Sequence, residues 1–214
     1  MIHKRKKIKN KYYREFLDSG MIQYVNEDHI KRALENVTGR FKTQGRAMLI
    51  CMYYTGARPN EVLRLESGDV DREKGYITIR MKGSKGGLPR VIRLPFKKEM
   101  VKEFYKYASS LPPHYLLFYM YHSRYRRMRM TKGGELRESK EISNKLRYYF
   151  NKWFDNVMLI PPYFLRHNRF SKLSEAGVSL QNIRQLKGSK TYESIMPYLH
   201  MSTEASKQAA KKMD

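Results

Sequence analysis

The sequence predicts a mostly helical α+β domain that contains one small antiparallel β-sheet. Apolar residues recur at helical spacing along most of the 214-residue chain, whereas residues 67–95 change to the alternating period of strands. Hydrophobic residues make up 41% of the chain, which is enough for one packed core, and the sequence contains no internal repeat. These observations favour one substantial domain with short appendages.

Three helices are expected at the start of this domain. The first begins after Asn26, whose side chain can cap the acidic first turn, and carries apolar residues along one face. The second covers about residues 43–54 and is apolar nearly all round, so it should lie at the centre. It ends at Gly56, and Pro59 then opens a third helix that ends near residue 65.

Two strands and four further helices are expected in the rest of the chain. The strands cover about residues 76–81 and 91–94, and the Gly-rich turn "KGSKGGLP" joins them into a hairpin, to which a third strand can add. Helical periodicity then returns over about residues 97–109, 138–157, 163–177 and 179–186.

The charge of the chain points to a polyanionic partner. Lys and Arg number 44 against 20 Asp and Glu, which gives a net charge of +24 and indicates nucleic acid, with a merely solvated basic surface as the alternative. No run of eighteen apolar residues is present, so membrane association is disfavoured. The single Cys51 excludes a disulfide framework and favours a reducing, cytoplasmic compartment.

Four separated polar residues have chemistry that suits one phosphate. Arg58 and Arg166 each interrupt an apolar segment, and two guanidinium groups can grip the non-bridging oxygens of a phosphate. Lys82 follows a strand at the hairpin turn, where its ammonium can reach a leaving oxygen. Tyr198 needs positive charge nearby to act as a nucleophile. Taken singly, each residue also fits an ordinary surface or ion-pair role, so spacing alone does not select them.

Three stretches that contain these residues resemble the motifs of the tyrosine recombinase (phage-integrase) family. "YYTGARPNEVLRLESGDV" is similar to the first motif, "MKGSKGGLPRVIRLP" to the β-hairpin, and "YFLRHNRFSKLSEAGVSLQNIRQLKGSKTYESIMPYLH" to the second motif. The resemblance covers about residues 26–200. It implies the catalytic-domain fold of that family, with Arg58 and Arg166 as catalytic arginines, Lys82 as catalytic lysine and Tyr198 as nucleophile.

Two positions depart from the family pattern. Tyr163 stands where the second motif has its first histidine, and Ser189 stands where the family has a histidine or tryptophan. Both side chains can donate a hydrogen bond to phosphate, but neither can act as an imidazole near neutral pH. Lys187 or Lys190 offers positive charge instead. The Tyr-x-x-Arg pattern resembles some integrases of archaeal plasmids and viruses.

The resemblance implies a site-specific recombinase that works without a metal ion or other cofactor. Tyr198 attacks the scissile phosphate to form a 3′-phosphotyrosyl bond, while Arg58, Arg166, Tyr163 and Ser189 hold the charge that develops. Lys82 protonates the leaving 5′-oxygen, and Glu61, one turn after Arg58, is expected to buttress the site. The expected partners are double-stranded DNA and further protomers, as a tetramer in the recombining complex, and no membrane.

The sequence leaves other functions open. A type IB topoisomerase-like enzyme uses the same cleavage chemistry to relax DNA, and a degenerate DNA-binding module would not cleave at all. Residues expected to contact DNA outside the catalytic set share a basic side chain: Arg124, Arg126, Arg127, Arg129, Lys145, Arg147, Lys187 and Lys190.

The expected domain division has three parts. Residues 1–19 form a basic arm, residues 20–200 the catalytic domain, and residues 201–214 a tail or a helix that docks on an adjacent protomer. The arm is too short to form the N-terminal core-binding domain that family members carry. We therefore expect either a catalytic-domain fragment or a minimal member that clamps DNA with its arm.

Overall fold

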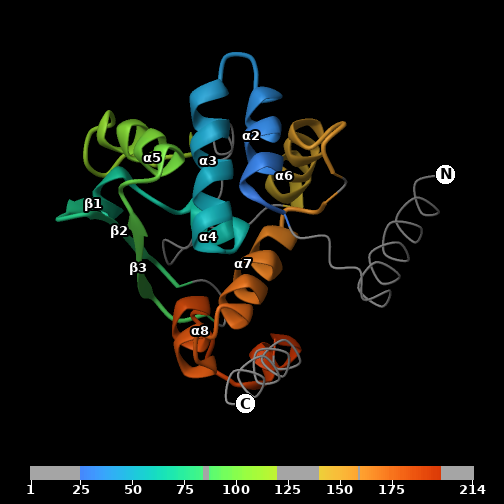
Figure 1. Ribbon diagram of the computed structural model, residues 1–214. Helices are drawn as coiled ribbons and strands as arrows, with labels where there is room; N and C mark the ends of the chain where they lie inside the picture. Colours follow the sequence, from blue (N-terminus) through green and yellow to red (C-terminus); the bar gives the residue numbers. More distant parts are fainter. Residues whose placement is uncertain (1–24, 84–86, 120–139, 159, 199–214) are drawn as a thin grey trace.

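The computed structural model describes residues 25–83, 87–119, 140–158 and 160–198, in which helices surround one small sheet (Figure 1). This architecture confirms the predicted mostly helical α+β fold. The predictions for the basic arm, for Arg124–Arg129 and for residues 201–214 lie outside the described residues. Within the described part, no helix is both long and apolar enough to cross a membrane.

The first helices form the centre of the molecule. Helix α2 spans Glu27–Glu35, and the Asn26 side chain accepts a hydrogen bond from the His29 N–H, so the predicted cap is confirmed. Helix α3 spans Lys42–Thr55, and its side chains are buried nearly all round, as its apolar sequence predicts. It ends at Gly56, whose φ of 59° is left-handed. Helix α4, Pro59–Leu63, follows directly.

The sheet contains three antiparallel strands in the order β1-β2-β3. They span Val70–Glu73, Tyr76–Met81 and Arg90–Pro95, and a short 3-10 helix, η1, leads into them over Ser67–Asp69. In the register of β2 and β3, Met81 pairs with Arg90 and Ile77 with Leu94. Strand β1 carried no clear sequence signal, because it is mostly polar and exposed and pairs with β2 alone.

The remaining helices complete the bundle around α3. Helices α5 and α6 span Glu99–Ser109 and Lys140–Trp153. The described α6 ends four residues earlier than the sequence predicts, before Asn156, whose φ of 57° a right-handed helix cannot accommodate. Figure 1 shows the sheet and α5 on one side of α3, and α2 and α6 on the other.

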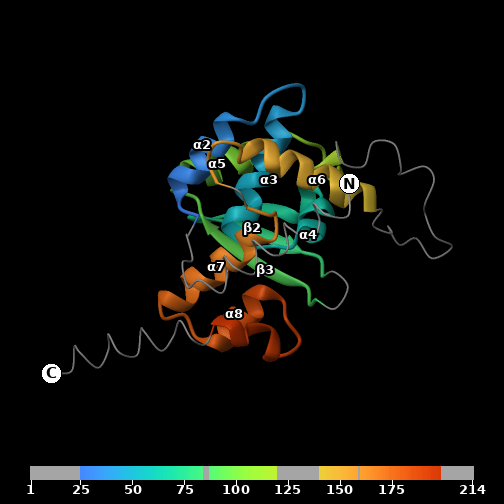
Figure 2. The same ribbon diagram turned by 90° about the vertical axis from the view of Figure 1, so that its right-hand side faces the viewer.

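The last elements extend to one end of the molecule, with α7 running from the main core towards α8 (Figures 1 and 2). Helices α7 and α8 span Phe164–Glu175 and Leu180–Lys187, and the 3-10 helix η3 spans Glu193–Tyr198. Phe170, Ile183 and Ile195, one from each element, form a small hydrophobic cluster of their own. This cluster holds η3 against α7 and α8, so the chain just before Tyr198 has a defined position.

Candidate active site

The site begins at the N-terminus of α4, where Arg58 and Glu61 bind each other. The Glu61 carboxylate accepts hydrogen bonds from the Arg58 backbone N–H at 2.9 Å and from Arg58 Nη1 at 2.8 Å. The Glu61 side chain is 0% exposed, whereas the Arg58 side chain keeps 25% of its surface exposed. The buried Glu61 carboxylate thus holds Arg58 in place, while part of the Arg58 side chain stays accessible to solvent.

A third residue, Arg90, reaches the same carboxylate from the sheet. Arg90 Nη2 donates a hydrogen bond to Glu61 Oε2 at 2.8 Å. Its side chain is buried, and within the described part of the chain its Nε and Nη1 atoms have no hydrogen-bond partner. Sequence reasoning missed Arg90, although a signal was present: it shares the strand parity of the buried Ile92 and Leu94, so its side chain points inward.

These contacts keep Glu61 ionised. Burial alone would raise the pKa of Glu61, but the hydrogen bond and charge of Arg90, together with the hydrogen bonds from Arg58, outweigh it and lower the pKa to about 2. The Glu61 carboxylate therefore stays negatively charged and holds the guanidinium groups of the arginines around it in place. This is the buttressing position expected for Glu61.

Arg166 enters the site from α7 and is 1% exposed. Its Nη1 donates to the Gly56 carbonyl at 2.8 Å, its Nη2 donates to the Lys187 carbonyl at 2.6 Å, and Nη1 lies 3.9 Å from Glu61 Oε2. Its Nε atom is buried and has no hydrogen-bond partner among the described residues. Burial, followed by the charge of Arg58, lowers the pKa of Arg166 to about 10, so it stays charged at neutral pH.

Lys187, the last residue of α8, adds a further cation. Its Nζ donates a hydrogen bond to the Ser194 carbonyl in η3, and its side chain is 6% exposed. The structure therefore places Lys187 inside the site, which differs from the outward position that a DNA-contact residue needs. The reason is helical spacing, because Lys187 lies one turn after the buried Ile183 on the same face of α8.

Together these residues form a cationic cluster, which we define as Arg58, Arg90, Arg166 and Lys187. The three arginines lie around the Glu61 carboxylate, and Lys187 interacts with Arg166 and Arg58. The cluster has more positive than negative charge, and burial of a donor without a partner destabilises the folded state. An incoming anion would relieve this imbalance. A phosphate fits best, because guanidinium groups bind its oxygens in pairs.

The hairpin closes one side of the cluster through a contact that requires glycine. Leu88 donates its N–H to the Gly188 carbonyl at 2.9 Å, and Gly87 and Ser189 form an isolated β-bridge. Gly188 has a left-handed φ of 63°, and a Cβ there would lie 2.7 Å from Arg90 Nη1. The hairpin and the end of α8 are therefore fitted directly against each other beside the arginines.

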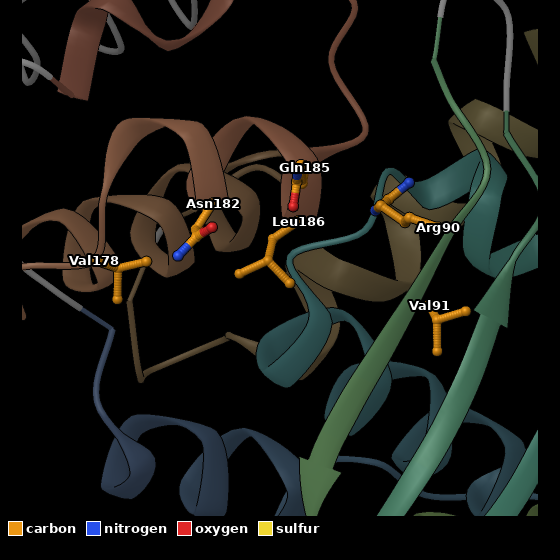
Figure 3. A pocket seen from close by; sticks show the side chains of 6 residues that line it. All are labelled: Arg90, Val91, Val178, Asn182, Gln185 and Leu186. Carbon is orange, nitrogen blue, oxygen red and sulfur yellow. The ribbon is translucent and has the colours of Figure 1, made fainter.

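A cavity of about 440 Å³ lies next to this contact, between the start of β3 and α8 (Figure 3). Arg90 forms one wall, and Asn182, Gln185 and Leu186 face it from α8. Neither Arg58 nor Arg166 lines this cavity. The cluster and the cavity thus share Arg90 but are separate features.

Lys82 occupies a different electrostatic setting, just after the end of β2. Its Nζ lies 3.0 Å from Glu66 Oε1 and 3.2 Å from Asp69 Oδ2, and 48% of the side chain is exposed. Burial would lower the pKa of Lys82, but the hydrogen bonds that it donates to these carboxylates, together with their charges, raise it overall. The described contacts of Lys82 are thus to acidic residues, and it has to leave them to reach a phosphate.

The two positions that depart from the family pattern are Tyr163 and Ser189. Tyr163 precedes α7 and is 41% exposed, and its ring meets that of His167 with centroids 5.2 Å apart. Burial and the charges of Lys187 and Arg166 lower the pKa of His167 to about 4. Ser189 is buried and its hydroxyl bonds the Ser194 hydroxyl. Neither position supplies an imidazolium at neutral pH.

Tyr198 is the last residue of η3, and its side chain lies outside the described residues. The alternative tyrosine in the same stretch, Tyr192, is exposed, with the Arg184 guanidinium 4.4 Å from its ring centroid. Among the predicted DNA-contact residues, Lys145, Arg147 and Lys190 are exposed. The described residues contain no group of three or more His, Cys, Asp and Glu that could hold a metal ion.

Comparison with known proteins identifies the family to which the chain belongs and solved structures that share its fold. The model of the phage integrase family matches residues 23–205. Tyrosine recombinase XerA of Pyrococcus furiosus is 23% identical over 188 residues, which cover 88% of this chain and 60% of that protein. Tyrosine recombinase XerC of Pelotomaculum thermopropionicum is 24% identical over 201 residues, which cover 92% and 63%. The chain thus spans about 60% of the length of these curated relatives.

Solved structures share the fold. The crystal structure of XerA recombinase has a TM-score of 0.57 at 21% identity, over 90% of this chain and 65% of that one. The post-cleavage complex of XerH recombinase with palindromic difH substrate also has a TM-score of 0.57, at 20% identity over 87% and 52%. These likenesses confirm the catalytic-domain fold that the motifs predicted.

Proposed function

The chain belongs to the phage integrase family. We propose that it is a site-specific DNA recombinase. It cleaves and rejoins DNA strands through a 3′-phosphotyrosyl intermediate. The observation that carries the proposal is the convergence of Arg58 and Arg166, from elements far apart in the sequence, beside the buried carboxylate of Glu61. The site carries an excess of positive charge that a scissile phosphate would balance.

The arginines bind the phosphate and stabilise its transition state. Arg58, with its exposed edge, and Arg166, whose Nε has no hydrogen-bond partner among the described residues, take the two non-bridging oxygens of the scissile phosphate. Glu61 holds both guanidinium groups before DNA arrives, so little reorganisation is needed during the reaction. Tyr163 and Ser189 add hydroxyl donors at the edges of the site.

The chemistry proceeds by two transesterifications. The Tyr198 hydroxyl loses its proton to solvent and its oxygen attacks phosphorus, the bond to the 5′-oxygen breaks, and the leaving oxygen takes a proton from Lys82. Lys82 exchanges Glu66 and Asp69 for DNA at this step. The 5′-hydroxyl of a second strand then attacks the phosphotyrosine and releases Tyr198. One phosphoester replaces another, so the sequence of steps needs no external energy source.

The partners follow from this chemistry. Duplex DNA is the substrate, in line with the net charge of +24 and with the DNA-bound state of the XerH relative. Strand exchange between two duplexes needs several active sites, so further protomers assemble on DNA, as a tetramer in the recombining complex. The protein works inside the cell, where the DNA is. A second candidate, a DNA-binding module that does not cleave, rests on the two missing imidazoles at Tyr163 and Ser189.

A suicide substrate tests the proposal. Its nicked strand loses a short 5′-hydroxyl fragment after cleavage, so a covalent protein–DNA adduct accumulates. We expect an adduct that resists denaturation from the wild type and from Tyr192→Phe, and none from Tyr198→Phe at equal DNA affinity. Joining of two differently labelled duplexes then separates a recombinase from a topoisomerase-like enzyme. DNA binding without adduct from the wild type would establish the non-cleaving alternative.

A further inference from the structure

Lys187 connects helix α7 to the 3-10 helix η3. Its backbone carbonyl accepts the 2.6 Å hydrogen bond from Arg166 Nη2. Its Nζ donates to the Ser194 carbonyl, within the 3-10 helix that ends at Tyr198. The Ser194 hydroxyl in turn bonds Ser189, the position at which the family motif carries an imidazole or indole. One lysine therefore joins the phosphate-binding arginine to the segment that carries the nucleophile.

The surroundings of Lys187 are unfavourable for an ordinary structural lysine. The charges of Arg166 on α7 and of Arg58 before α4 act on it, and Arg90 lies beside the next residue from β3. Its own charge in turn acts on His167 of α7. A buried ammonium next to guanidinium groups opposes folding. Such an arrangement fits a site that an anion completes.

We propose that Lys187 is a positioning residue for the cleavage step, which ties η3 to Arg166 and adds positive charge where the imidazole is missing. The inference rests on the proposed function. In this arrangement the ammonium holds the Ser194 carbonyl in η3, and the same charge lies close to Arg166, which binds the scissile phosphate. Both contributions are stronger with the protonated side chain, because a charged donor makes the stronger hydrogen bond and only the ammonium adds positive charge.

The protonation of Lys187 gives the inference a distinctive signature. Burial, then the charges of Arg166 and Arg58, lowers the pKa of Lys187 to about 8. The ammonium is therefore present below about pH 8 and lost above it, and bound phosphate moves this transition upward because an anion favours the charged form. The contribution of Lys187 to cleavage is thus largely present at pH 7 and decreases in alkaline solution.

Single-turnover cleavage of the suicide substrate between pH 6 and 10 tests this signature. At pH 7 we expect Lys187→Met to cleave about 10- to 100-fold more slowly than the wild type, as for loss of a hydrogen bond from a charged group. The ratio of the two rates should fall toward one as the pH rises. Lys187→Arg, which stays charged, should remain active without the alkaline loss. Lys106→Met removes an exposed lysine charge on α5, away from the site, and serves as the matched control.

Hydrogen exchange in the DNA-free protein provides an independent measurement of positioning. The Ile195 N–H donates to the Tyr192 carbonyl at 2.8 Å within the η3 region. Its exchange should accelerate about tenfold or more in Lys187→Met and stay slow in Lys187→Arg. If Lys187→Met does not fold, the wild type supplies the test: Ile195 protection, corrected for base catalysis, should fall as the pH rises past 8, and Lys187→Arg should abolish that fall.

The outcomes separate the two proposals. A rate ratio that does not change with pH, together with unchanged Ile195 exchange, would overturn the role of Lys187 and leave it as packing. Absence of adduct from the wild type with every DNA tested would overturn the recombinase function, and the exchange measurement alone would then decide whether Lys187 positions η3.

Discussion

Replacing Glu61 by glutamine should destabilise the protein by about 3 kcal/mol at neutral pH. The carboxylate is fully buried, accepts hydrogen bonds from Arg58 and Arg90, and lies 3.9 Å from Arg166. Its pKa falls from 4.5 to about 2 on folding, and each unit corresponds to about 1.36 kcal/mol in favour of the charged state. Removal of one partner from a buried ion pair has a similar effect, roughly 3 to 5 kcal/mol.

The dependence on pH has a definite sign. Because the pKa of Glu61 is lower in the folded protein, its contribution to stability is complete above about pH 4.5 and is lost as the pH falls toward 2. Urea unfolding of wild type and Glu61→Gln at pH 7 and pH 3 measures this directly. The difference in unfolding free energy should shrink by about half or more at pH 3.

A matched control distinguishes the loss of a buried carboxylate from the loss of an exposed one. Glu99→Gln removes a carboxylate that is 83% exposed and pairs with Lys102, so it should change stability by less than about 1 kcal/mol. If Glu61→Gln also stays within about 1 kcal/mol of the wild type at pH 7, or if its loss is the same at pH 3, the carboxylate does not hold the cationic cluster together. The idea of a preorganised phosphate site would then be wrong.

Further predictions concern the reaction and the binding of DNA. Arg58→Ala and Arg166→Ala should each slow single-turnover cleavage several hundredfold, since a transition-state contact of this kind contributes roughly 3 to 4 kcal/mol; a rate near that of the wild type would remove either residue from the phosphate site. Lys82→Ala should lose much less activity on a substrate whose leaving 5′-oxygen is replaced by sulfur, which needs no proton. An equal loss on both substrates would show that Lys82 is not the acid. DNA affinity should fall steeply with salt, and deletion of residues 1–19 should reduce the slope of log K against log salt by about 0.9 for each phosphate that those residues neutralise in the intact protein. An unchanged slope would make those residues passive.

The sequence predicted the elements whose signals are local. Asn26 and Gly56 mark helix ends through their own backbone and side-chain chemistry, so those boundaries agree with the structure. Strand β1 was harder to predict, because its three exposed residues show no alternation and its place in the sheet depends on pairing with β2. The early end of α6 likewise depends on the left-handed backbone at Asn156, for which the sequence offers only a weak signal.

The sequence motifs predicted the residues of the candidate site that belong to the motifs, but not the contacts between them. Arg58 and Arg166 were selected by resemblance, and the structure brings both beside Glu61. Arg90 was missed because the strand parity that places it inward was not applied to a charged residue. The burial of Lys187 follows from its spacing to Ile183, whereas its contact with Ser194 depends on how η3 folds back. Such contacts are tertiary, and periodicity alone does not contain them.

The most direct test of the central claim is to identify the residue that bonds to DNA. Adduct formed on the suicide substrate can be digested with a protease that cuts after glutamate, which separates Tyr192 from Tyr198 at Glu193. Mass spectrometry then locates the nucleotide on one of the resulting peptides. We predict a 3′-phosphotyrosyl linkage at Tyr198, in the peptide that begins at Ser194. A linkage at Tyr192, or at any other residue, would contradict the proposed mechanism.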